Sequence, residues 1–192
     1  MNKTYVFAGL LGLGVCMGLA LTSLAPEPAR THTIEWLDNP RELPPFQLES
    51  AEGEFTNRSL KGRWTILSFG FMNCPDVCPT SLSELAALSN LADVIFVSVD
   101  PKRDSADELD RYVRNFDATF QGVTGEEQEL RRLGDALGIQ FRVTGEDEAS
   151  AVAHSVTSSI VDPEGLFRGR FRPGFDAVLA SHEFGRLGER EI

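Results

Sequence analysis

Residues 64–99 read WTILSFGFMNCPDVCPTSLSELAALSNLADVIFVSV and contain the pattern on which the predicted fold rests. Both ends, Trp64–Gly70 and Val94–Val99, are rich in β-branched and aromatic residues, which predicts two strands covered on both faces of a sheet. Between them, Ser81–Leu91 carries leucines at helical spacing, and its first residue fits a capping box with Glu84. Strand, helix and strand in this order predict one βαβ unit.

The sequence on either side of this unit extends the alternation of strands and helices. Turn residues and apolar spacing predict an N-terminal hairpin around Ala51–Gly53, helices over Ser105–Phe116 and Glu126–Leu137, a hairpin of Ser158–Val161 and Leu166–Phe171, and a final helix over Phe175–Phe184. This order is typical of an α/β, thioredoxin-like fold, in which helices flank a central mixed sheet.

Composition limits the classes of protein that fit. The chain has 192 residues, 42% of them hydrophobic, which is enough for one ordinary domain after a short apolar N-terminus. With 29 acidic against 18 basic residues the formal charge is −11, so a nucleic acid partner is not expected. Three cysteines are too few for a small domain held together by disulfides.

The N-terminus predicts an exported domain. Tyr5–Ala25 contains no charged residue and, as a helix rising about 1.5 Å per residue, spans roughly 30 Å. We therefore expect residues 1–25 to form a single membrane anchor. Lys3 precedes the run, which places the rest of the chain outside the cytoplasm, on the periplasmic side. A cleaved secretory signal ending at Ser23–Ala25 is the alternative, and the domain is then secreted or periplasmic.

Residues 26–45 mix prolines with polar residues and follow neither a helical nor a strand period. This composition predicts a linker between the membrane segment and the domain. The thioredoxin-like domain is accordingly expected over residues 46–192.

The motif CPDVCP, residues 74–79, carries the chemistry. Cys74 and Cys78 lie four positions apart, between the end of a predicted strand and the start of a predicted helix. Unpaired N–H groups and the helix dipole favour thiolates there, which predicts thiol pKa values below the ordinary value of about 8.5. A metal site, a redox pair and a structural disulfide all fit two such cysteines. Asp76 is interpreted mainly as a cap of backbone amides, with metal ligation as the alternative.

A histidine decides between these interpretations. The chain has three histidines, of which His32 in the linker and His182 near the C-terminus are interpreted as surface residues. His154 immediately precedes the C-terminal hairpin, where a thioredoxin-like topology returns the chain beside the first helix. Two thiolates and one imidazole suit Cu(I) and also hold Cu(II) with a weak further ligand, whereas zinc normally takes four ligands.

Four segments together resemble the Sco/SenC family of membrane-anchored copper proteins: Phe69–Thr80, Val97–Asp104, Ala153–Ser155 and Ile160–Gly165. The resemblance implies that copper is bound by Cys74, Cys78 and His154. It also implies a role in building the dinuclear copper centre of cytochrome c oxidase, and a periplasmic location.

The resemblance further implies the partners: cytochrome c oxidase subunit II or another cuproprotein as acceptor, and a copper donor or thiol reductant. The chain departs from the family pattern at Ala153, where members often have an aspartate before the histidine. Met72 also stands where other residues are usual and is interpreted as packing.

Two functions remain open at this point. As a metallochaperone, the chain holds copper and passes it to an acceptor by ligand exchange. As a thiol-disulfide oxidoreductase, Cys74 and Cys78 reduce the copper-ligand cysteines of an acceptor or act in redox signalling. A peroxidase is less favoured, because Phe71 stands where such enzymes place a threonine or serine.

Overall fold

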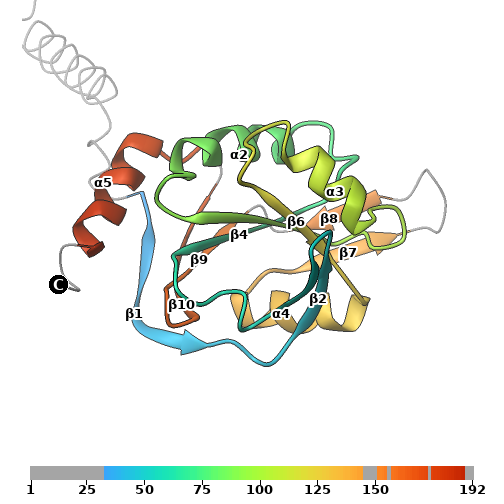
Figure 1. The fold of residues 1–192 in the computed structure, drawn as a ribbon, viewed down its shortest axis with the longest axis horizontal. Coiled ribbons are helices and arrows are strands. Elements are labelled where there is room, and N and C mark those ends of the chain that lie inside the picture. The colour runs from blue at the N-terminus through green and yellow to red at the C-terminus, as the bar shows by residue number, and fades with distance from the viewer. Residues whose placement is uncertain (1–32, 145–150, 155–156, 173, 189–192) are drawn as a thin grey trace, which may run out of the picture. The chain divides into compact units, whose positions relative to one another are not determined.

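An eight-stranded mixed sheet organises the chain in the computed structural model shown in Figure 1. The structure describes residues 33–144, 151–154, 157–172 and 174–188. The predicted membrane anchor, residues 1–25, lies outside the described residues. Of the helices that are described, none is both long enough and apolar enough to cross a membrane.

The strands follow the order β1-β10-β9-β4-β5-β6-β2-β3 across the large sheet, and β7 and β8 form a separate pair. β4, β5 and β6 run parallel, whereas the remaining pairs are antiparallel. The strands are β1 (Glu35–Glu42), β2 (Gln47–Ser50), β3 (Gly53–Thr56), β4 (Thr65–Gly70), β5 (Asp93–Ser98), β6 (Gln121–Thr124), β7 (Phe141–Thr144), β8 (Ala151–His154), β9 (Ser158–Val161) and β10 (Leu166–Phe171).

Helices cover both faces of the sheet (Figure 1). One core cluster joins one face to α2, α3 and α5, and a second joins the other face to α4. Successive side chains of β4 point to opposite faces of the sheet, so Ile66 belongs to the first cluster and Leu67 to the second. The helices are α2 (Val77–Leu85), the short 3-10 helix η1 (Ala86–Leu88), α3 (Ala106–Val113), α4 (Glu127–Leu137) and α5 (Ala177–Gly188).

This architecture confirms the predicted βαβ unit and the mixed sheet flanked by helices. β4 is buried at all six positions, as expected for a strand covered on both faces. The N-terminal hairpin is present as β2 and β3, with Leu48 opposite Phe55. The C-terminal hairpin is present as β9 and β10.

Several boundaries differ from the prediction. The helix after the cysteine motif begins at Val77 rather than Ser81, so the predicted capping box is absent, and Glu84 instead accepts a hydrogen bond from the backbone N–H of Gly174. Residues 35–42, which the sequence places in a linker, form β1 beside β10. The structure also contains β6, β7 and β8, which the sequence pattern does not predict.

Candidate metal centre

The two cysteines lie where β4 passes into α2. Cys74 is in the connecting loop, and Cys78 is the second residue of the helix. In the described part of the chain neither cysteine is joined in a disulfide, and the two residues are 8% and 4% exposed. The backbone N–H of Cys78 donates a hydrogen bond to the Cys74 sulfur over 3.4 Å. The first turn of α2 therefore presents an amide to one sulfur and carries the other.

Cys78 lies in an apolar environment. A Cβ atom on Gly70 would be 2.8 Å from the Cys78 sulfur and 2.6 Å from Cε2 of Phe96, so the absence of a side chain leaves room for the sulfur. Burial, followed by the hydrogen bond and charge of Cys74, raises the pKa of Cys78 to about 12. The predicted lowering of the thiol pKa is wrong for Cys78, because loss of hydration outweighs the helix dipole.

Asp104 connects the cysteine loop to the loop after β5. Its side chain is 1% exposed, and Oδ2 accepts hydrogen bonds from the Met72 backbone N–H at 2.9 Å and the Ser98 hydroxyl at 2.6 Å. Burial raises the pKa of this carboxyl, while the two hydrogen bonds act in the opposite direction. Asp104 thus fixes the backbone two residues before Cys74.

Tyr112 of α3 stands near the thiols. The centroid of the Tyr112 ring is 5.9 Å from the centroid of the Phe96 ring, which lies beside Gly70 together with the Cys78 sulfur. Burial, followed by the charges of Cys78 and Cys74, raises the pKa of Tyr112 to about 12. The phenol is therefore neutral at physiological pH. Tyr112 falls inside the helix predicted over Ser105–Phe116, and the spacing of apolar residues in that helix gives no signal of a site.

Asp76 does not make the side-chain cap that the sequence predicts. It is the N-cap residue of α2, but no cap hydrogen bond from its side chain is present. Its carbonyl oxygen instead accepts hydrogen bonds from the backbone N–H and the hydroxyl of Thr80, at 3.2 and 2.9 Å. The amino end of α2 is thus held by backbone and threonine contacts.

His154 ends β8, and its Cα partner on β7 is Phe141. Its imidazole lies outside the side chains that the structure describes, so the predicted third ligand stays a prediction. Among the described side chains, no three His, Cys, Asp or Glu residues form a group that could hold a metal ion. His182, predicted to be a surface residue, is exposed on α5.

Comparisons with known proteins connect this arrangement to a family. A model described as SCO1/SenC matches residues 36–184, a range that contains Cys74, Cys78 and His154. A Stutzerimonas stutzeri protein whose name describes copper binding is 37% identical over 146 residues, which are 71% of this chain and 72% of that protein.

Solved structures agree with the family match. Arabidopsis thaliana ScoI with copper bound has a TM-score of 0.68 at 30% identity, covering 76% of this chain and 98% of its own. Apo Sco1 of Thermus thermophilus has a TM-score of 0.74 at 29% identity, covering 83% of this chain and 99% of its own. The fold class expected from the sequence is therefore confirmed.

Proposed function

This chain belongs to the SCO1/SenC family, and from that premise we propose that it binds copper and delivers it to an acceptor protein. One observation carries the proposal: two buried cysteines, neither joined in a disulfide in the described part of the chain, lie together at the junction of β4 and α2. Sulfur is a soft ligand that selects Cu(I), and copper stands high in the affinity order of divalent metals. The donor chemistry of Cys74 and Cys78 thus fits copper, whose part is that of cargo held by soft ligands.

We propose His154 as the third ligand, and the position of the chain after it supports this. Thr157 and Ser158 line a small cavity together with Cys78, and Ser158 pairs with Ser68 of β4. Three residues of extended chain span at most about 11 Å, so the Cα atom of His154 lies within that distance of Thr157. An imidazole on such a short connection completes the set of two sulfurs and one nitrogen.

The surrounding residues orient this set and exclude water from it. Asp104 holds the backbone at Met72, the hydrogen bond from Cys78 to the Cys74 sulfur fixes the loop, and Gly70 admits the second sulfur into the core. Fixed ligands lose little conformational entropy on binding. Copper is then released to an acceptor by stepwise exchange of ligands. Cys74 suits this exchange because it lies in the loop rather than in the helix.

The proposed acceptor is cytochrome c oxidase subunit II, whose dinuclear copper centre the family resemblance names, or another cuproprotein. The proposed location is the periplasmic side of a membrane, with residues 1–25 as the anchor. The apolar run Tyr5–Ala25 supports this location. Membrane fractionation with externally added protease tests it, because a periplasmic domain is digested once the outer barrier is opened and a cytoplasmic one is protected.

The contact between the thiols also supports a second candidate, a thiol-disulfide oxidoreductase. In this reaction Cys74 and Cys78 form a disulfide, while a disulfide of the acceptor gains two electrons and two protons to become two thiols. The two candidates differ in their need for the imidazole. Dithiol exchange needs only the sulfurs, whereas copper retention also needs His154.

Copper titration of the reduced chain and its variants tests the proposal. We expect stoichiometric binding in the unaltered chain, and loss of tight binding in Cys74→Ser and Cys78→Ser. His154→Ala should lower copper affinity about 100-fold, equivalent to about 2.7 kcal/mol, and change the Cu(II) absorption. It should leave disulfide formation between Cys74 and Cys78 intact.

His182→Ala is the matched control, because it removes the exposed histidine of α5 and should leave copper affinity unchanged. Stoichiometric, tight copper binding in either cysteine variant would contradict the proposed site. Equal copper affinity in His154→Ala and His182→Ala would remove the imidazole from the ligand set and favour the oxidoreductase.

A further inference from the structure

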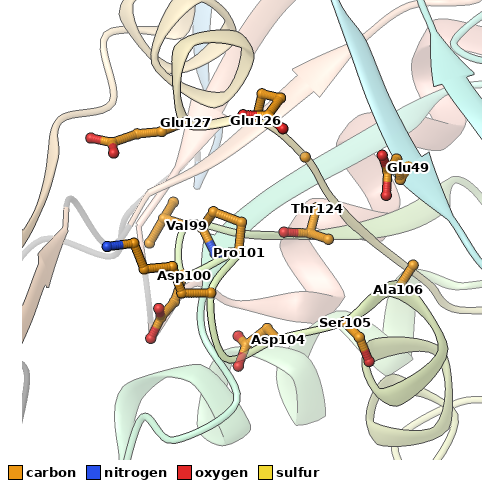
Figure 2. Close-up of a pocket in the computed structure, with 12 residues that line it drawn as sticks. Glu49, Val99, Asp100, Pro101, Asp104, Ser105, Ala106, Thr124, Glu126 and Glu127 are labelled. Atoms are coloured by element: carbon orange, nitrogen blue, oxygen red, sulfur yellow. The ribbon is translucent and has the colours of Figure 1, made fainter. Parts of the chain in front are cut away.

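A cavity of about 750 Å³ lies beyond the carboxyl ends of β5 and β6 (Figure 2). Its walls are the loop 99–106 before α3, the segment 124–127 before α4, and Glu49 of β2. Cavities of this size hold small organic groups or side chains in other proteins. Neither cysteine lines it, so copper binding does not account for it.

The topology marks this position as a binding crevice. β5 and β6 are adjacent and parallel, but the chain leaves β5 through α3 on one face of the sheet and leaves β6 through α4 on the other. In open α/β sheets, ligands bind in the crevice that opens where two such connections diverge. The cysteine loop instead follows β4, whose helix α2 shares a face with α3.

Thr124 supplies a polar group that the fold does not use. The residue is 5% exposed, and its hydroxyl oxygen has no hydrogen-bond partner among the described residues. In Figure 2 this oxygen points toward Pro101, which lines the cavity opposite it. Burying a hydroxyl without a partner is unfavourable. A ligand in the cavity that displaces the side chain of Pro101 would give the Thr124 hydroxyl a hydrogen-bond partner.

The charges around the cavity favour a basic ligand. Asp100 is paired with Arg103, and Glu127 is paired with Arg131. Glu49 and Glu126 are exposed carboxylates and have no such partner in the described part of the chain. Of the described residues that line this cavity, Lys102 alone carries a cationic side chain. Two helices begin at this cavity, and the amino end of a helix attracts anions. The two unpaired carboxylates nevertheless repel an anion here.

These carboxylates also lie on a boundary between two cavities. A second cavity, of about 490 Å³, shares Glu49, Gly125 and Glu126 with the first and continues past Phe46 toward Arg132. Glu49 is the Cα partner of Thr124 across β2 and β6, so the two side chains stand on the same face of the sheet. The space is therefore elongated, with its unpaired negative charge near the middle.

From this geometry we propose that the elongated groove binds an extended segment of a partner protein through one basic side chain. The guanidinium or ammonium group lies between Glu49 and Glu126, and the segment continues into both cavities. Thr124 accepts a hydrogen bond from the basic group. The proposal stands without copper, since no residue of the groove is a proposed ligand. Asp104 lines the cavity and also holds Met72, so the docked segment lies beside the cysteine loop.

Fluorescence anisotropy of a labelled peptide tests the proposal with the full chain in detergent at low salt. The probe is Ala-Ala-Arg-Ala-Ala with blocked ends, and the comparison peptide replaces arginine by glutamate. We expect saturable binding of the arginine peptide only. Glu49→Gln combined with Glu126→Gln should weaken binding about tenfold, and Thr124→Val should weaken it about threefold.

Asp38→Asn combined with Glu42→Gln is the matched control, because it removes two exposed carboxylates from β1 at another place in the sheet. Binding in this control should stay within about twofold of the unaltered chain. Equal weakening in both double variants would overturn the proposal, since net charge alone would then explain binding. Tighter binding of the glutamate peptide would overturn the basic ligand. Competition by free agmatine as effective as the peptide itself would overturn the protein segment as its source.

Discussion

At Gly70 the backbone of β4 passes under the Cys78 sulfur with no space for a side chain. A Cβ atom there would lie within 3.0 Å of Cys78 and of the Phe96 ring, both of which are buried. We expect Gly70→Ala to lower the free energy of unfolding by about 1–3 kcal/mol, because one of these neighbours must move. Urea unfolding of the reduced chain measures this change.

Gly185→Ala is the corresponding control on α5. No atom lies within 4 Å of a Cβ built at this exposed helical glycine. The higher helix propensity of alanine should therefore raise the free energy of unfolding by about 0.5–1 kcal/mol. Equal stability of Gly70→Ala and the unaltered chain would show that the core around Cys78 adapts without loss.

Asp104 allows a sharper test, because charge and hydrogen bonding can be separated there. Asp104→Asn keeps an oxygen that can accept from both the Met72 N–H and the Ser98 hydroxyl, so its stability at pH 7 should be within about 1 kcal/mol of the unaltered chain. Asp104→Leu leaves both buried donors without an acceptor and should cost at least about 2 kcal/mol. Thermal unfolding ranks the two variants, and a reversed order would mean that the hydrogen bonds contribute little.

At the scale of elements, β1 and α5 are connected by one buried carboxylate. Glu183 is 5% exposed, and it accepts hydrogen bonds from the Thr33 backbone N–H at 2.7 Å and from Trp36 Nε1 at 3.1 Å. Trp36, Trp64 and Phe184 pack edge to face beside it, with ring centroids 5.7–6.1 Å apart. Edge strand and terminal helix are thus held by the same polar contact and ring cluster.

We expect Glu183→Leu to lower the protection of α5 and β1 against hydrogen exchange by about 2 kcal/mol, because two donors lose their acceptor. Exchange in β4 and β5 should change less. Glu183→Gln keeps one acceptor oxygen and should give an intermediate effect. Uniform loss of protection across the sheet would contradict the view that β1 and α5 form a separately stabilised edge.

The same elements show what sequence patterns reveal and what they hide. The βαβ unit and both cysteines are predictable, because strand composition, helical spacing and the motif are local. β1 is hidden, since its register shifts between Trp36 and Arg41 and Pro40 interrupts any alternation. The start of α2 is misplaced because Ser81 and Glu84 fit a capping box, which puts the predicted start after Pro79. Pro79 occupies the first turn of α2, where a missing backbone N–H removes no hydrogen bond within the helix. Asp104 escapes notice, because its contacts to Met72 and Ser98 exist only in three dimensions.

For the whole molecule, excess acidity and buried carboxyls act together. The formal charge of −11 opposes compaction more strongly as carboxyl groups ionise. Asp162 is 2% exposed and lies in the turn between β9 and β10. Its Oδ1 accepts hydrogen bonds from the backbone N–H groups of Glu164 and Leu166. Burial nevertheless raises the pKa of Asp162, whereas hydrogen bonds from Ser105 lower the pKa of the exposed Glu108. The two groups thus make stability depend on pH with opposite signs.

The sign for Asp162 follows from linkage. Its folded pKa lies above the unfolded value of 3.8, so its contribution to stability is complete below that pH and is lost as pH rises through the folded pKa. The unaltered chain should therefore lose stability relative to Asp162→Asn between pH 4 and 7, measured as the difference in urea unfolding free energy. Glu108 has a folded pKa below 4.5, so its contribution is complete above that value and is lost on acidification. The unaltered chain should accordingly gain stability relative to Glu108→Gln as pH rises from 3 to 5. If the Asp162→Asn difference instead grew in favour of the unaltered chain with rising pH, the hydrogen bonds and Arg168 would outweigh burial at this turn.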